Sequence, residues 1–173
     1  MPKQCQVVGC ENNVWGKGYC KFHQHFRVDK KEKRVVERFS DEVDDLQLLI
    51  DDLDAETSRM IRYKYADKNG IVECFTCDAK LPINKIQCGH FIPRTHMATR
   101  FLPDNLRPQC PTCNEYKNGN LTIFAKRLEQ EKGGITEWLH EQARQVYKPS
   151  RTELKELLLE YRQKIQLYKT KFQ

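Results

Sequence analysis

The C-terminal segment has apolar residues that repeat at alternating steps of four and three, which is the pattern of an amphipathic helix. The residues of this stripe are Leu154, Leu158, Tyr161, Ile165, Tyr168 and Phe172. Ser150 and Glu153 have the spacing of a capping box directly after Pro149, and so predict where the helix begins. Such a stripe packs on its own chain more often than on a partner, but in a chain with little core it also suits a homodimer seam.

A second stretch of helical spacing lies in the acidic part of the chain. Its apolar positions are Val43, Leu46, Ile50 and Leu53. Ser40 stands where an N-cap is needed, and the pattern weakens near Asp54 before it resumes. We therefore expect a helical connector that is broken near Asp54 and ends by Asn69-Gly70, where glycine suits a helix C-terminus.

Beyond residue 70 the pattern changes to short β-type runs punctuated by proline and cysteine. Two such runs, at 71–72 and 85–87, precede His90. Helical spacing resumes after the last cysteine, is interrupted by Gly119, and continues over 122–131. This order predicts a small amount of sheet followed by helix.

The composition is poor in the apolar surface that would bury a chain of this length by packing alone. Only 39% of the 173 residues are hydrophobic, whereas 31% are charged. The chain has eight cysteines, most of them in short-spaced clusters with histidine nearby, which suits zinc better than disulfides and predicts a reducing, cytoplasmic location. The chain contains no apolar run long enough to cross a bilayer and does not begin with a secretory signal, so we expect no membrane association.

Charge is distributed unevenly along the chain. The formal net charge is +6, yet residues 41–56 contain eight acidic side chains and no lysine or arginine. The remainder is therefore strongly basic, as expected of a surface that meets the phosphates of DNA. The acidic segment can be a solvated helix face, which is the commoner case, a guard for the basic face, or a contact for a partner protein.

Two C-x₂-C pairs form the strongest motif of the chain. Cys74 and Cys77 make up one pair, and Cys110 and Cys113 make up the other, with 32 residues between them. Two sulfurs from each tight turn complete the tetrahedral shell of a structural zinc ion that joins distant segments. Cys88 falls outside both pairs, and we interpret it as a small buried residue.

A second cluster lies near the start of the chain. Cys5, Cys10, Cys20 and His23 have the spacing C-x₄-C-x₉-C-x₂-H, which is less restrictive than the central motif. The three cysteines and one histidine predict a second structural zinc ion in an N-terminal knuckle. The knuckle can serve to dock onto DNA, or only to fold residues that are too few to fold alone.

Between the two halves of the central motif lie Gly89-His90-Phe91 and the stretch Asn105-Leu-Arg-Pro-Gln-Cys110, which continues to Cys113-Asn114. This arrangement resembles the HNH (ββα-metal) nucleases. More closely, residues 57–134 resemble the lambdoid phage recombination proteins called NinG or Rap. The resemblance implies a metal-dependent endonuclease that cleaves branched recombination intermediates such as Holliday junctions or D-loops.

The chemistry expected of these residues follows from what phosphodiester hydrolysis requires. His90 can act as the general base that activates water at neutral pH. Asn105 can hydrogen-bond to the hairpin or to the imidazole, and Asn114 can offer its carbonyl oxygen to Mg²⁺ or Mn²⁺. Asn118 lies one helical turn further and is a second candidate ligand for the catalytic ion.

One residue departs from the HNH pattern. Many HNH nucleases have a metal-binding Asp or His directly before the catalytic histidine, whereas this chain has Gly89. Either another group, such as His96 or Asp104, completes the shell, or water and substrate phosphate hold the ion, as Mg²⁺ tolerates.

The basic residues around these motifs are the candidate phosphate contacts. They are Arg94, Arg100, Arg107 and Lys117.

These observations together predict an α+β chain with a small zinc-stapled ββα-metal (HNH) core, helical extensions and an N-terminal zinc knuckle. The expected organisation is a knuckle over 1–25, a helical connector with the acidic helix over 26–69, a nuclease core over 70–134 and C-terminal helices over 135–173. The expected activity is hydrolysis of branched DNA, with a recombination protein as a further partner through the acidic helix. The alternatives are a non-catalytic zinc DNA-binding adaptor or regulator, and an HNH nicking endonuclease that acts on duplex DNA.

Overall fold

The computed structural model describes residues 3–6, 10–15, 19–26 and 30–172, with side chains over 3–6, 10–15, 19–23 and 45–172. The chain divides into two compact units, 1–45 and 46–173, and each is described by itself. A mixture of helices and two small antiparallel sheets makes up the described chain. Its second unit contains three hydrophobic clusters, as expected where no single large core can form.

The first unit contains the N-terminal cysteine cluster. Its described residues form an isolated antiparallel bridge between Gln4 and Asn13 and a short helix, η1 (Lys21–Phe26). Cys5 N–H donates to the Asn12 carbonyl and Trp15 N–H donates to the Tyr19 carbonyl, so backbone hydrogen bonds join the described segments of this unit. This part of the chain has too few residues for a core of its own, which is the situation in which a metal ion commonly stabilises a fold.

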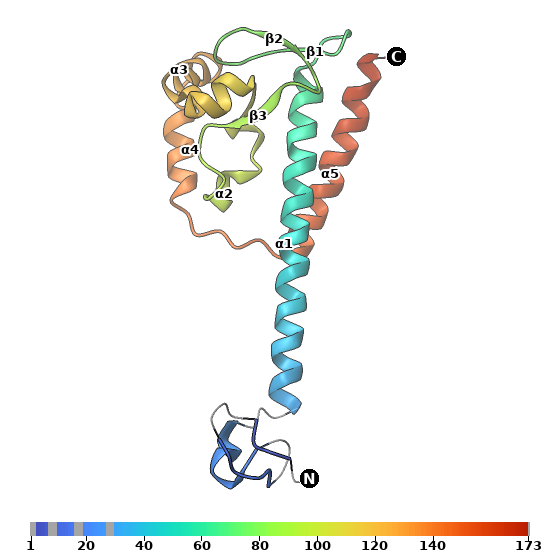
Figure 1. The fold of residues 1–173 in the computed structure, drawn as a ribbon. Coiled ribbons are helices and arrows are strands. Elements are labelled where there is room, and N and C mark those ends of the chain that lie inside the picture. Colours follow the sequence, from blue (N-terminus) through green and yellow to red (C-terminus); the bar gives the residue numbers. More distant parts are fainter. Residues whose placement is uncertain (1–2, 7–9, 16–18, 27–29, 173) are drawn as a thin grey trace. The chain divides into compact units, whose positions relative to one another are not determined.

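The long helix α1 (Lys30–Tyr65) corrects two expectations about the connector (Figure 1). Ser40 lies inside the helix and does not begin it, and the helix continues through Asp54 without a break. The physical reason is that no glycine or proline occurs between residues 30 and 65, so a weak apolar pattern alone does not end the helix. The predicted stop is confirmed, because the helix ends before Gly70, which has a φ of 73°.

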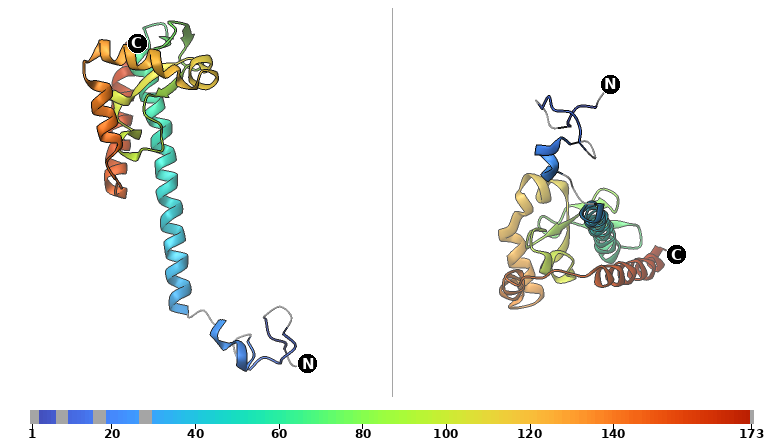
Figure 2. Two further views of the ribbon diagram at one scale, coloured as in Figure 1. Left: turned by 90° about the vertical axis from the view of Figure 1, so that its left-hand side faces the viewer. Right: turned by 90° about the horizontal axis from the view of Figure 1, so that it is seen from below.

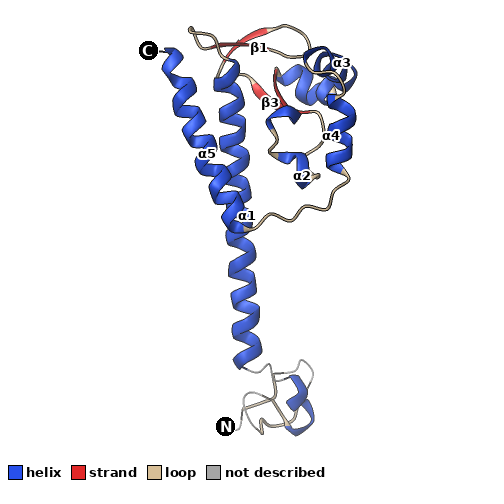
Figure 3. Cartoon of the chain, turned by 180° about the vertical axis from the view of Figure 1, so that it is seen from behind, coloured by secondary structure: helices blue, strands red, loops and turns tan. Residues whose placement is uncertain are grey.

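The C-terminal helix α5 (Arg151–Lys169) packs along the second half of α1, as Figures 1, 2 and 3 all show. The capping box is confirmed, because Glu153 N–H donates to the Ser150 hydroxyl and Ser150 N–H donates to the Glu153 carboxylate. Four stripe residues are buried in the same cluster as Ile50, Leu53, Met60 and Ile61 of α1. These stripe residues are Leu154, Leu158, Tyr161 and Ile165.

The apolar stripe is therefore covered within the chain, which is the commoner of the two alternatives considered above. At the end of the stripe the Phe172 ring packs edge-on against Tyr63 with 5.8 Å between the ring centroids, but its side chain remains 37% exposed. A homodimer stays a prediction.

Two separate hairpins follow α1. Strands β1 (Ile71–Glu73) and β2 (Lys80–Pro82) pair antiparallel, and so do β3 (Gln87–His90) and β4 (Leu106–Gln109). The β-type run at 71–72 is part of β1, and the run at 85–87 contributes only Gln87 to β3. Strands β2 and β4 contain proline, which weakens a strand pattern in a sequence and explains why neither was expected.

Short helices cover the second hairpin and continue the chain. They are α2 (Met97–Arg100), η2 (Pro103–Asn105), η3 (Thr112–Tyr116), η4 (Asn118–Asn120), α3 (Leu121–Glu131) and α4 (Ile135–Ala143). The expected interruption at Gly119 is confirmed, since its φ of 81° kinks the chain before α3. The order β3, β4, η3 and α3 is thus two antiparallel strands followed by helix. None of the described helices is long and apolar enough to span a membrane.

Candidate functional site

The four cysteines of the central motif lie together in the second unit. Cys74 and Cys77 come from the turn between β1 and β2, whereas Cys110 and Cys113 follow β4. Their sulfur atoms all lie within 4.8 Å of one another, and the Cys77 and Cys110 sulfurs are 3.7 Å apart. Tetrahedral zinc with Zn–S bonds of about 2.3 Å separates its sulfurs by roughly 3.8 Å. The donor set and its spacing therefore fit a zinc ion that joins the two hairpins.

Hydrogen bonds shape this cysteine cluster. Cys74 N–H donates to the Ala79 carbonyl at 2.8 Å, and Cys113 N–H donates to the Cys110 sulfur at 3.4 Å. Arg127 of α3 binds the Asp78 carboxylate and the Phe75 carbonyl, so the β1–β2 turn is also tied to the helix. Burial raises the pKa of the Cys110 thiol, and the hydrogen bond from Cys113 N–H opposes this rise in part.

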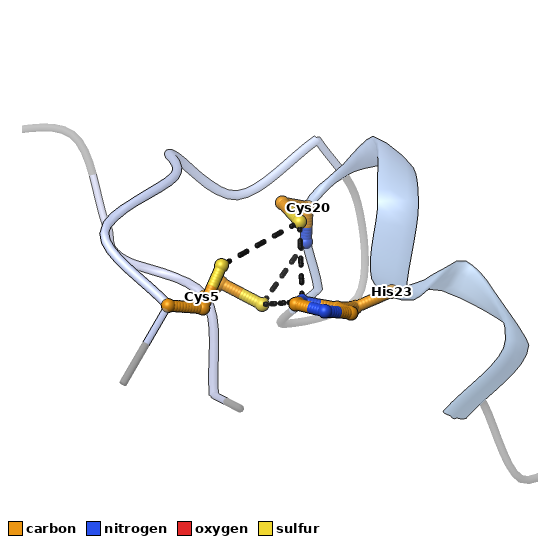
Figure 4. A group of neighbouring side chains, drawn as sticks. Cys5, Cys20 and His23 are labelled. Carbon is orange, nitrogen blue, oxygen red and sulfur yellow. Dashed lines mark hydrogen bonds between the residues drawn. The ribbon is translucent and has the colours of Figure 1, made fainter. Parts of the chain in front are cut away.

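The N-terminal cluster also converges. Cys5, Cys20 and His23 face one another in Figure 4, and the His23 Nδ1 atom is 3.4 Å from each of the two sulfurs. Cys10 completes the group, with its sulfur 3.8 Å from that of Cys20. Three sulfurs and one imidazole nitrogen at this separation also fit a tetrahedral zinc ion. The two predicted clusters could therefore each hold zinc.

Cys88 belongs to neither cluster. Its side chain is buried among the residues that join α1 to α5, and burial raises the pKa of its thiol to about 12. A thiol so far from ionisation is a small apolar residue and not a metal ligand, which agrees with the interpretation from the sequence.

His90, the expected general base, ends β3 and lines a pocket of about 310 Å³. Asn114, Asn118 and Arg94 line the same pocket. The structure thus brings together four residues that the sequence singled out, from β3, from η3, from η4 and from the loop after β3. Gly119 and Leu121 complete the wall on the α3 side.

The imidazole of His90 is held in its neutral form. Burial, and after it the positive charge of Arg94, lower the pKa of His90 to about 4, against the opposing effect of the Asp54 carboxylate. Within the described part of the chain the Nε2 atom is buried and has no hydrogen-bond partner. A neutral imidazole can accept a proton at physiological pH, which is the state that a general base requires.

Asn105 does not contact the imidazole through any described hydrogen bond. It is fully buried, its side-chain oxygen accepts from Ile92 N–H at 2.7 Å, and its amide donates to the carbonyls of Ile92 and Thr99 at 3.0 Å each. Its backbone carbonyl also accepts from Phe91 N–H. Of the two roles considered for Asn105, the structure favours support of the hairpin loop that follows His90.

Asn114 has a defined orientation in the π-helical turn η3. Its amide nitrogen donates to the Gln87 side-chain oxygen at 2.7 Å, and this bond engages the nitrogen end of its side-chain amide. Asn118 is exposed, and its φ of 47° is in the left-handed region that asparagine tolerates better than most residues. Mg²⁺ and Mn²⁺ accept amide oxygens as ligands, so the side-chain oxygens of both asparagines could bind such an ion.

Gly89 is required by a residue that the sequence analysis missed. Gln109 of β4 is fully buried on the same face of the hairpin, and a Cβ at residue 89 would lie 2.7 Å from its Cδ and 2.9 Å from its Cγ. Its amide donates to the Thr76 hydroxyl at 2.9 Å and to the Gly119 carbonyl at 2.7 Å. Gln109 therefore links the zinc-binding turn to the wall of the His90 pocket, and residue 89 has no room for a side chain.

The four basic candidates divide into two pairs. Arg107 is buried, and it binds the Glu131 carboxylate at 2.5 Å and several backbone carbonyls. Arg100 makes two hydrogen bonds to Asp54, at 3.1 and 2.6 Å. Both guanidinium groups are engaged inside the protein, which favours a structural part for them, and their contact with phosphate stays a prediction. Arg94 lies 3.8 Å from Asp54 and is half-exposed, and Lys117 is exposed, so both side chains could reach a phosphate.

The two substitutes considered for a ligand at residue 89 do not line the pocket. His96 is exposed and its Nδ1 atom lies 3.1 Å from the Ala143 carbonyl, whereas Asp104 pairs with Lys132 at 3.3 Å. The sequence also offered no sign that Asp54 lies beside Arg94 and Arg100, near the His90 pocket. No local pattern marks it, because its arginine partners are some forty residues away along the chain.

The fold and its clusters define a mixed helical protein with two small sheets and two Cys/His groups that could hold zinc. A family model described as Bacteriophage Lambda NinG protein matches residues 4–171, so the chain belongs to the NinG family of phage recombination-related proteins. The match reaches well beyond 57–134 and includes the N-terminal cluster and the acidic helix. No curated protein and no solved structure matches the chain.

Proposed function

We propose that this protein is a metal-dependent endonuclease of the HNH class that cleaves branched DNA, such as Holliday junctions or D-loops, during phage recombination. The observation that carries the proposal is the pocket shared by His90, Asn114, Asn118 and Arg94. A base, two amide oxygens and a guanidinium are the groups that phosphodiester hydrolysis requires in one place. The order of two strands followed by helix, with His90 at the end of the first strand, supports the same class.

The proposed reaction is an in-line attack of water on phosphorus. His90 accepts a proton from the water as the new oxygen–phosphorus bond forms and the bond to the 3′-oxygen breaks. The leaving 3′-oxygen takes a proton from solvent water, so the products carry a 5′-phosphate and a 3′-hydroxyl. Arg94 and Lys117 bind phosphates of the strand, and their contribution falls as the salt concentration rises.

A catalytic Mg²⁺ or Mn²⁺ ion would be held by the side-chain oxygens of Asn114 and Asn118, and it would stabilise negative charge on the phosphate and the leaving oxygen. The hydrogen bond from the Asn114 amide to Gln87 directs the oxygen end of that side chain away from Gln87. Asn105 and Gln109 act as positioning residues, because they hold the loop after His90 and the turn that carries Asn118.

The test compares cleavage of a labelled four-way junction, a flap and a plain duplex by the zinc-loaded protein. Mg²⁺ or Mn²⁺ is added or withheld, and the variants are His90→Ala and His140→Ala. His140 is the matched control, because this histidine of α4 packs edge-on against Phe91 and does not itself belong to the described lining of the pocket. We expect His90→Ala to bind junctions without cutting them, and His140→Ala to cut as the wild type does.

The second candidate function is a zinc DNA-binding adaptor without catalysis. It is favoured by the buried Nε2 atom of His90 and by the absence of a ligand at Gly89. Wild-type protein that binds junctions but never cuts them with either ion would support the adaptor. Equal cleavage of duplex and junction would instead support a nicking enzyme.

A further inference from the structure

Two large aromatic side chains of the N-terminal cluster are exposed to solvent. Trp15 is 71% exposed and Phe22 is 74% exposed. Tryptophan and phenylalanine are normally among the most buried residues of a protein, so two in one small module need a reason.

Phe22 can be compared with Phe75 of the central cluster, although Phe22 directly precedes its second ligand whereas Phe75 directly follows its first. Phe22 lies between the candidate ligands Cys20 and His23, as Phe75 lies between Cys74 and Cys77. Phe75 is partly buried and packs edge-on against Phe124, with 5.0 Å between the ring centroids. Phe22 is instead left in solvent, although both neighbouring ligands fix the turn that carries it. A metal-binding turn therefore does not by itself expose the aromatic residue.

The charge around these rings favours a polyanion. Residues 1–25 contain three lysines and one glutamate, and Lys3 and Lys21 are exposed in the structure. Lys21 is adjacent to Phe22 at the start of η1. Exposed aromatic rings combined with lysines are the features with which proteins bind single-stranded nucleic acid, by stacking on bases and by contacts to phosphates.

We propose that the N-terminal cluster is a binding site for single-stranded DNA, in which unpaired bases stack on Trp15 and Phe22 while Lys3 and Lys21 contact phosphates. Duplex DNA buries the faces of its bases and cannot use the rings in this way. The proposal is independent of cleavage, and it gives the N-terminal cluster a role in recognising the unpaired strand of a branched substrate.

The chain offers a direct optical test, because it contains two tryptophans, Trp15 and Trp138. In the Trp138→Phe variant the tryptophan fluorescence comes from Trp15 alone. In the Trp15→Phe variant it comes from Trp138 alone. Zinc-loaded full-length protein, without added Mg²⁺ or Mn²⁺, is titrated with oligo(dT) and with a duplex of the same length. We expect oligo(dT) to quench the Trp138→Phe protein and to leave the emission of Trp15→Phe almost unchanged.

Affinity for oligo(dT) gives the second readout. Stacking is worth about 1–3 kcal/mol for each base, so Trp15→Ala and Phe22→Ala should each weaken oligo(dT) binding roughly 5-fold to 150-fold. Duplex affinity should change little, and Trp138→Ala should bind oligo(dT) as the wild type does.

Three results would overturn the proposal. They are unchanged oligo(dT) affinity in both alanine variants, an equal loss for oligo(dT) and duplex, and loss of zinc from either variant. Unchanged affinity would point to a protein partner for the rings, whereas zinc loss would show that the rings are structural. None of these results depends on whether the protein cleaves DNA.

Discussion

The side chain of Gln109 lies over the α-carbon of Gly89 on one face of the β3–β4 hairpin, and it fills the space that a side chain at residue 89 would need. From there the Gln109 amide reaches Thr76, between two cysteines of the central cluster, and Gly119, on the wall of the His90 pocket. The glycine that departs from the usual HNH pattern is therefore part of a buried hydrogen-bond network.

Gly89→Ala tests this relationship. The added methyl group would overlap Gln109, which cannot move without breaking its two hydrogen bonds, so we expect a loss of about 1–3 kcal/mol in the free energy of unfolding. Urea denaturation measures the loss. Gly133→Ala is the matched control, because a Cβ there meets no atom within 4 Å.

A double variant sharpens this test. In Gly89→Ala combined with Gln109→Ala the overlap is gone, so the two losses should not add. Fully additive losses would contradict a direct contact between these two residues.

The second prediction concerns the pH dependence of stability that His90 contributes. In the unfolded chain its pKa is near 6.5, and in the folded protein it is about 4. Above pH 6.5 the residue is neutral in both states. Below it the unfolded state binds a proton that the folded state does not, so stability falls as the pH decreases from 6.5 to 4, by at most about 3 kcal/mol.

Urea titrations of the wild type and of His90→Asn at several pH values isolate this effect. The difference in the free energy of unfolding between the two proteins should change by that amount between pH 7 and pH 4. Effects of low pH on the cysteine clusters are common to both proteins and cancel in the comparison. A difference that stays constant over this range would show that His90 titrates normally.

Zinc content provides the third prediction. The wild type should bind two zinc ions per chain, whereas Cys110→Ser and Cys10→Ser should each lose one, because either change removes a ligand from one cluster. Cys88→Ala is the control and should keep both ions, since Cys88 lies in neither cluster. Elemental analysis of the purified variants gives the count.

The effect on folding should differ between the two serine variants. Cys110→Ser should also lower the unfolding temperature of the second unit, because its zinc joins two hairpins. Cys10→Ser should leave that transition in place, since its cluster belongs to the first unit. Loss of both ions from either variant would contradict independent sites.

The fourth prediction separates two arginines that look alike in the sequence. Arg107→Ala removes a buried guanidinium from Glu131 and from several carbonyls, so it should cost about 2 kcal/mol or more of stability. Arg94→Ala removes a half-exposed group and should leave stability nearly unchanged.

For DNA binding we expect the opposite: Arg94→Ala should have the larger effect and Arg107→Ala the smaller. Arg94→Ala should weaken binding to all DNA sequences and reduce the slope of log affinity against log salt by about one, which a fluorescence titration at several salt concentrations measures. If the correctly folded Arg107→Ala protein loses the same salt dependence, then Arg107 contacts phosphate after all.

Much of the candidate site was predictable from local spacing. Each C-x₂-C pair and the capping box at Ser150 depend on a few residues close in sequence, whose geometry the local backbone fixes, and metal-ligand spacing indicated which pairs belong together. The stripe from Leu154 to Ile165 likewise predicted its helix, although two different surfaces could have covered it. Only packing against α1 decided between them.

The tertiary structure alone decided the roles that depend on distant partners. Arg100 and Arg107 are residue types that commonly bind phosphate. In the structure, however, Arg100 binds Asp54 and Arg107 binds Glu131. Gln109 gave no signal, because a glutamine becomes informative only when a hairpin brings it over Gly89. Residue types and short spacings determine which chemistry is available, whereas burial and long-range pairing determine which side chains remain to perform it.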